Sequence, residues 1–151
     1  MKNIQFTGFI SEYHPNIANA MPYKNYFKGR CIEEKYRDKV LDYTKNGILF
    51  CPSMRAIEDL LSNKSVGSGS FYTDGKWIWP EYMIYYLKNN PNYHVEDVFI
   101  KDLVNKGFKY DKSKINERKL NFFLSKHIDG WWFAFKAFYL HRIIRKCLKR
   151  G

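Results

Sequence analysis

One stretch near the middle of the chain, residues 70–80 with the sequence SFYTDGKWIWP, decides the fold. Its two aromatic segments flank the pair Asp74-Gly75, which predicts a tight β-hairpin because both turn positions favour positive φ. Trp77 and Trp79 alternate with an isoleucine, so their indole rings face one side of the hairpin. In a chain that is 19% aromatic, this pattern favours core packing over base stacking for the two rings.

Helices are predicted on the C-terminal side of the hairpin. Pro80 suits the first position of a helix, and residues 82–87 are apolar or aromatic on every side, which indicates a largely buried helix. Asparagines and a proline at 89–92 end it. A second helix is predicted over 95–106, with its end at Gly107. Its apolar face consists of Val95, Val98, Phe99 and Leu103.

On the N-terminal side, apolar residues at helical spacing predict a helix over 33–46, which Gly47 is expected to end in the left-handed conformation. An apolar run over 48–51 predicts a buried strand, and residues 4–10 predict another strand or docked segment. Ser53 is placed to cap a further short helix. The apolar face of that helix would consist of Ile57, Leu60 and Leu61.

Two more helices are predicted near the C-terminus. Ser113 is expected to cap the first, which carries a single apolar stripe. The second is predicted over 131–149, and in its second half basic residues gather opposite an apolar side. The apolar stripe of the first consists of Leu120, Phe123, Leu124 and Ile128.

These elements together predict an α+β fold, in which a small antiparallel sheet or hairpin packs with several α-helices and the chain ends in a basic amphipathic helix. At 151 residues the chain has the length of one domain, 1–151. Its composition divides it into an α+β body over about 1–111 and a basic helical region over 112–151.

The positive charge is concentrated in that C-terminal region. The net charge is +11, and residues 112–151 carry 11 of the 26 basic residues but only two of the 15 acidic ones. Such asymmetry favours an acidic counterpart, which can be a nucleic acid, an anionic membrane surface or an acidic protein. The alternative interpretation is a solvated helix face that only aids solubility.

No catalytic residues, metal site or cofactor are predicted. The segment 66–70 contains G-x-G, but no helix with a Lys-Ser/Thr pair follows, so close backbone packing is favoured over phosphate binding. The four histidines lie in no ligand spacing, and His127 falls on an apolar stripe that favours partial burial. His141 has basic neighbours but no second catalytic group. The adjacent carboxylates Glu58 and Asp59 are interpreted as surface charge.

The ends and the cysteines indicate a reducing compartment. Cys31, Cys51 and Cys147 form no C-x-x-C pair, which argues against a disulfide scaffold and a thiolate zinc site, and they are expected to be inert thiols. The N-terminus does not resemble a signal peptide, and the segment 128–148 is too charged to span a membrane. We therefore expect a cytoplasmic protein without a membrane span.

The sequence 73–80, TDGKWIWP, with Gly67–Tyr72 before it and Tyr85-Tyr86 after it, resembles small bacterial proteins with a T-D-G-x-W-x-W-P core. Some of these are immunity proteins encoded beside polymorphic or contact-dependent growth-inhibition toxins. The resemblance covers about residues 39–108. It implies stoichiometric inhibition, in which the protein binds a cognate toxin domain, often a nuclease, and occludes its active site without being an enzyme.

The charge departs from the common case, because inhibitors of basic nuclease toxins are usually acidic. We therefore predict a toxin domain that is acidic at the contact, or a contact carried by the near-neutral body. The alternative function is that of a nucleic-acid-binding protein that uses the basic C-terminal helix non-specifically. The residues predicted to bind the partner share one stripe of that helix, and they are Arg142, Arg145, Lys146 and Lys149.

Overall fold

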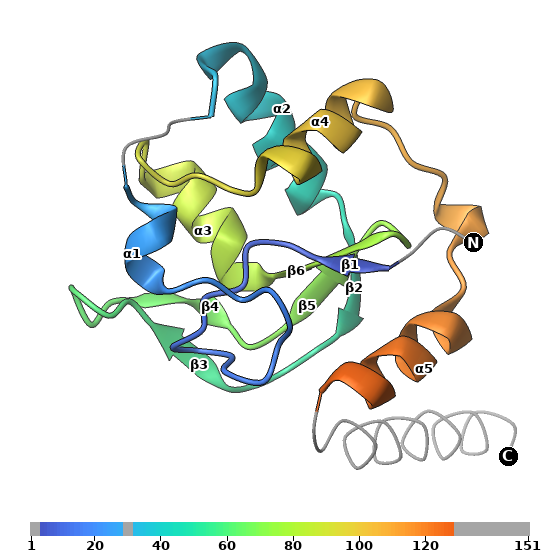
Figure 1. Ribbon diagram of the computed structural model, residues 1–151, viewed down its shortest axis with the longest axis horizontal. Helices are drawn as coiled ribbons and strands as arrows, with labels where there is room; N and C mark the ends of the chain where they lie inside the picture. Colours follow the sequence, from blue (N-terminus) through green and yellow to red (C-terminus); the bar gives the residue numbers. More distant parts are fainter. Residues whose placement is uncertain (1–3, 29–31, 129–151) are drawn as a thin grey trace, which may run out of the picture. The chain divides into compact units, whose positions relative to one another are not determined.

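The computed structural model describes residues 4–28 and 32–128 and divides the chain into two compact units, Met1–Ile115 and Asn116–Gly151. Its helices and small, mostly antiparallel sheet confirm the α+β class (Figure 1). The elements are β1 (Gln5–Phe6), α1 (Tyr23–Tyr26), α2 (Glu34–Lys45), β2 (Ile48–Cys51), β3 (Ala56–Glu58), β4 (Ser65–Ser68), β5 (Phe71–Thr73), β6 (Trp77–Pro80), α3 (Glu81–Asn89), α4 (Asp97–Asn105), the 3₁₀ turn η1 (Lys112–Lys114) and α5 (Glu117–His127).

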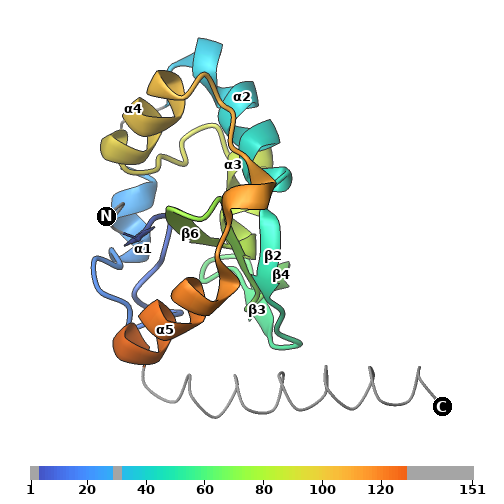
Figure 2. The same ribbon diagram turned by 90° about the vertical axis from the view of Figure 1, so that its right-hand side faces the viewer.

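The predicted hairpin forms the centre of a four-stranded sheet. The strand order is β1-β6-β5-β2, in which β5 pairs with both β6 and β2 in antiparallel fashion and β1 lies parallel to β6. The helices α2, α3 and α4 lie on one side of this sheet in both ribbon views (Figures 1 and 2). Trp77 and Trp79 face that side, where their rings contact Phe99 of α4 at centroid distances of 5.2 and 6.2 Å. Both indoles are buried, so the prediction of core packing is confirmed.

The turn of the hairpin lies one residue later than predicted. Asp74 N donates to Trp77 O at 3.3 Å, so Gly75 and Lys76 are the two central residues. Only Gly75 has a positive φ, 92°, whereas Asp74 does not. A glycine at the first central position is typical of a type II′ turn, which also matches the twist of the strands. Asp74 is thereby free to use its side chain for the turn.

Gly47 has a packing role instead of the predicted left-handed conformation. Its φ is not positive, although α2 ends close to the expected place. A Cβ atom on Gly47 would lie 2.3 Å from Cζ2 of Trp79. The indole N–H of Trp79 donates to Thr44 O at 3.3 Å. The glycine therefore makes room for the central indole beneath the end of α2.

The helix predicted after Ser53 is wrong, because β3 and β4 form a separate two-stranded hairpin there. Asp59 N donates to Lys64 O at 2.8 Å and closes its turn. Ile57 is buried, but Leu61 in the turn is 79% exposed. The spacing of Ile57, Leu60 and Leu61 suggested one face of a helix. The chain instead turns between Asp59 and Lys64, and this turn joins β3 to β4.

The helices after the hairpin differ from the prediction in the burial of one position of α4 and in the capping residue of α5. In α4, Phe99 and Leu103 are buried as expected, whereas Val98 is 64% exposed. The cap of α5 is Asn116, whose Oδ1 accepts from Lys119 N at 3.0 Å, and not Ser113, which lies in η1. The predicted helix over 131–149 lies outside the described residues.

A single arginine ties α2 to the end of α3. Arg37 donates from Nη2 to Leu87 O at 2.8 Å and from Nη1 to Pro91 O at 3.0 Å, and it also donates to Asn90 O. The last carbonyls of a helix have no partner within that helix. Arg37 satisfies one of them, that of Leu87, together with two carbonyls just beyond the helix, and its positive charge suits the negative end of the helix dipole.

Candidate functional site

A cavity of about 330 Å³ lies beside the Gly75–Lys76 turn, which forms one part of its lining. Lysines from the β5–β6 turn, the end of α4 and the following segment line this cavity, together with two aspartates, Asp74 and Asp111. We call it the lysine cavity. Its lysines are Lys76, Lys106, Lys109 and Lys114.

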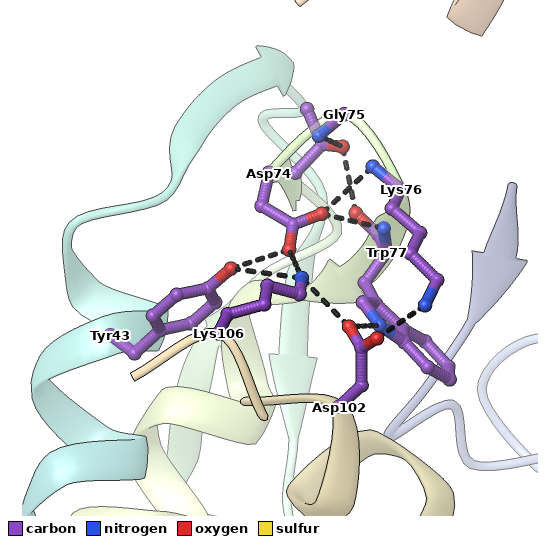
Figure 3. A network of polar contacts seen from close by, with 8 residues as sticks. Tyr43, Asp74, Gly75, Lys76, Trp77, Asp102 and Lys106 are labelled. Carbon is purple, nitrogen blue, oxygen red and sulfur yellow. Dashed lines mark hydrogen bonds and ion pairs between the residues drawn. The ribbon is translucent and has the colours of Figure 1, made fainter. Parts of the chain in front are cut away.

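Asp74 is the buried anchor of the site (Figure 3). Its side chain is 1% exposed. One carboxylate oxygen accepts from the backbone N–H groups of Lys76 and Trp77 at 2.8 and 2.6 Å. The other accepts from the Tyr43 hydroxyl and from Lys106 Nζ at 2.8 Å. These four donors satisfy both oxygens, so the buried carboxylate has hydrogen-bond partners and holds the turn in place.

Thr73 completes the fixing of the turn. Its hydroxyl donates to Trp77 O at 2.7 Å and accepts from Gly75 N at 2.9 Å. The Thr-Asp-Gly sequence thus supplies a hydroxyl, a carboxylate and a positive-φ glycine to one turn. These three residues explain the motif as a structural device that holds a loop rigid.

A second carboxylate, Asp102, joins the lysines to the core. It accepts from Lys106 Nζ at 2.7 Å, from the Trp77 indole N–H at 2.8 Å, and from Lys76 (Figure 3). Burial alone would raise the pKa of Asp102, but the hydrogen bonds from Lys106, Lys76 and Trp77 lower it to about 2. Asp102 is therefore ionised at neutral pH and holds both ammonium groups in place.

The other two lysines are available at the surface. Lys114 Nζ lies 3.2 Å from Asp111 Oδ2, and 82% of the Lys114 side chain is exposed. Among residues 4–28 and 32–128, no ion pair involves Lys109. The site thus combines two lysines held by carboxylates, Lys76 and Lys106, with two exposed lysines that are chemically suited to bind an anionic group.

Sequence reasoning missed most of this site. The predicted hairpin placed Asp74 and Gly75 at the turn, but nothing local linked them to Tyr43, Asp102 or Lys106. One available signal was the i, i+4 spacing of Asp102 and Lys106, which on a helix predicts an ion pair. The structure shows that pair and adds Asp74 to it.

A second buried carboxylate holds the β3–β4 turn. Asp59 was interpreted as surface charge, but it is 8% exposed. It accepts from the hydroxyls of Tyr23 and Tyr86, both at 2.7 Å, and from Ser62 N at 2.8 Å. The Tyr86 hydroxyl also lies 3.1 Å from that of Tyr13. The correction has a plain cause, because the tyrosines that satisfy Asp59 are distant in sequence.

Acid should remove the contribution of Asp59 to stability. Burial would raise its pKa, but the hydroxyls of Tyr86 and Tyr23 lower it to about 2, against about 3.9 in an unfolded chain. The contribution, roughly 1–2 kcal/mol, is therefore complete above pH 4 and is lost as the pH falls towards 2. In urea unfolding, the difference between wild type and Asp59→Asn should shrink from pH 6 to pH 2.5. The neighbouring Glu58→Gln, at an exposed side chain, is the control, and an equal difference at both pH values would contradict the prediction.

The glycine-rich segment packs closely, as predicted. A Cβ atom on Gly67 would lie 3.3 Å from Glu81 Cγ, and the Gly67 φ is 131°. Glu81 Oε2 accepts from Ser68 N at 2.8 Å and from the Ser68 hydroxyl. A carboxylate of the chain itself thus occupies the backbone donor that a phosphate would use.

The remaining predicted residues are not brought together. Burial raises the pKa of the Cys51 thiol to about 12, which agrees with an inert thiol. His127 is exposed and not partly buried as predicted, and its Nδ1 lies 2.7 Å from Phe123 O. His141 lies outside the described residues. So do the predicted partner-binding residues Arg142, Arg145, Lys146 and Lys149.

Within residues 4–28 and 32–128, no group of three or more His, Cys, Asp or Glu side chains is placed to hold a metal ion. No helix in the same ranges has the length and apolar character needed to cross a membrane. Comparison with protein-family models, curated proteins and solved structures finds no match to the chain.

Proposed function

We propose that this protein is an immunity protein, which binds a cognate bacterial toxin domain and neutralises it by stoichiometric occlusion. The observation that supports the proposal is the use of the motif residues 73–77. The Thr73 hydroxyl and the Asp74 carboxylate hold the turn in place through hydrogen bonds, while the lysines beside that turn line a surface cavity. A rigid, charged surface of this kind serves recognition.

The physical advantage of such a surface lies in its preorganisation. Binding costs free energy when side chains and loops must be ordered, and a surface already fixed by buried hydrogen bonds avoids much of that cost. Fixed positive charge also accelerates association with an acidic partner. We assign the basic stripe Arg142, Arg145, Lys146 and Lys149 the second of these roles, as charges that steer the same partner.

The experiment that tests the proposal uses the reading frame directly upstream of the gene. Its C-terminal domain is expressed from an inducible promoter in bacteria, with and without this chain on a second plasmid. We expect growth arrest without the chain, growth with it, and a 1:1 complex in size-exclusion chromatography with light scattering. Growth arrest that persists with the chain present, with no complex formed, would contradict the proposal.

A further inference from the structure

We infer that the lysine cavity is the site that receives an acidic side chain of the partner protein, with Lys109 and Lys114 as its cationic ligands. In the free protein, Asp111 pairs with Lys114 and holds the place of the incoming carboxylate. The identity of the partner rests on the proposed function, whereas the carboxylate-binding chemistry is a property of the cavity itself.

The charges of the cavity leave an excess that faces solvent. Four lysines and two aspartates line it. Asp74 is buried and its two oxygens are satisfied by four donors, one of which is Lys106. Asp111 is therefore the lining carboxylate that a partner would meet. Lys114 pairs with it, and Lys109 lines the same cavity without an ion pair among the described residues, whereas the ammonium groups of Lys76 and Lys106 are already compensated by Asp74 and Asp102.

The segment that carries Lys109 and Lys114 is held at several points. The Tyr110 hydroxyl donates to Asn46 O at the end of α2, and the ring of Tyr110 contacts that of Tyr43 at 5.3 Å. Ile115 packs against the turn, since a Cβ atom on Gly75 would lie 3.0 Å from its Cγ1. The backbone that carries both lysines is thereby placed before a partner arrives, which lowers the entropic cost of binding.

The size and composition of the cavity favour a carboxylate. A volume of about 330 Å³ admits one or two side chains and not a helix. Lysine is a point charge that suits a single anionic group, such as the carboxylate of an aspartate or glutamate side chain. The 3.2 Å contact between Lys114 and Asp111, three residues apart in the chain, shows that Lys114 can pair with a carboxylate at this surface.

The internal aspartate gives the inference a distinctive consequence. If Asp111 holds the place of the ligand, its neutralisation should improve binding. Asp111→Asn keeps an oxygen that can accept from Ser113 N, as Asp111 Oδ1 does at 3.0 Å, so η1 should be preserved. We expect roughly twofold to fivefold tighter binding of an acidic peptide by this variant.

The test titrates the full-length, ¹⁵N-labelled protein with a blocked hexaglutamate peptide and follows its amide resonances. We expect the largest shift changes at Gly75, Lys109 and Lys114. The double variant Lys109→Gln/Lys114→Gln should bind the peptide at least about fivefold more weakly. Lys24→Gln/Lys88→Gln, at two exposed lysines of α1 and α3, is the matched control and should bind like wild type.

Three outcomes would overturn the inference. They are shift changes spread evenly over the surface, equal losses of affinity in both double variants, and tighter binding of a short DNA duplex than of the peptide at the same amides.

The toxin experiment separates the inference from the proposed function. Neutralisation that survives Lys109→Gln/Lys114→Gln overturns the cavity as the contact and leaves the immunity function standing. Peptide binding at the cavity without neutralisation by wild type supports the site and removes the function.

Discussion

Trp79→Ala should lower the free energy of unfolding by about 3–5 kcal/mol, the usual cost of truncating a buried aromatic ring. Trp79 is fully buried, contacts Phe99 and fills the space that Gly47 leaves. Removal of the ring opens a cavity at the junction of α2, α4 and the sheet. The melting temperature should fall by roughly 6–20 °C, measured by circular dichroism.

Leu61→Ala provides the control for this measurement. Leu61 is 79% exposed in the β3–β4 turn, so its truncation should change the free energy of unfolding by no more than about 0.5 kcal/mol. A near-wild-type melting temperature for Trp79→Ala would place the indole at the surface. That result would make base stacking a serious interpretation of the two tryptophans again.

Asp74→Ala should cost a similar amount, about 3–5 kcal/mol, for an electrostatic reason. The change leaves Lys106 without one of its two carboxylates, and it removes the acceptor of the Tyr43 hydroxyl and of two backbone N–H groups. Each buried donor left without an acceptor costs free energy. Urea unfolding followed by fluorescence measures the loss.

Two further variants show whether charge or shape is responsible. Asp74→Asn keeps one oxygen for the backbone N–H groups of Lys76 and Trp77, and it replaces the oxygen that accepts from Tyr43 and Lys106 by an amide NH2 group. Its loss of stability should therefore be smaller than that of Asp74→Ala. Asp38→Ala, at an exposed carboxylate of α2, should change stability little. If all three variants unfold at the same urea concentration as wild type, Asp74 does not anchor the turn.

The sequence predicted well those elements that local patterns determine. The hairpin, α2, α3 and the burial of Trp77 and Trp79 follow from turn residues and periodicity within short windows. The exceptions had a different origin. The role of Gly47 depends on a ring that arrives from β6, and the hairpin of β3 and β4 depends on Asp59 and the tyrosines that satisfy it. Such long-range contacts leave no local pattern.

Of the candidate site, only the turn at Asp74 and Gly75 could be predicted from the sequence. Asp74 and Gly75 were predicted at the turn, but Lys106, Lys109 and Lys114 come from the end of α4 and from the segment after it. The formal net charge along the sequence is most positive over residues 112–151, and the prediction of a basic surface was therefore placed there. A sum of formal charges does not show which of them are buried. Acidic groups of the body such as Asp59 and Asp74 are buried, and the lysines beside Asp74 were therefore overlooked.

The contact between Gly47 and Trp79 has a consequence for how this sequence can evolve. A side chain at position 47 would collide with the Trp79 indole, so position 47 cannot enlarge while Trp79 is present. A lineage could gain a residue at 47 only after a smaller ring had replaced Trp79, and the intermediate would carry the cavity. A side chain at position 47 should therefore be found only together with a smaller residue at position 79, whereas Gly47 is compatible with either.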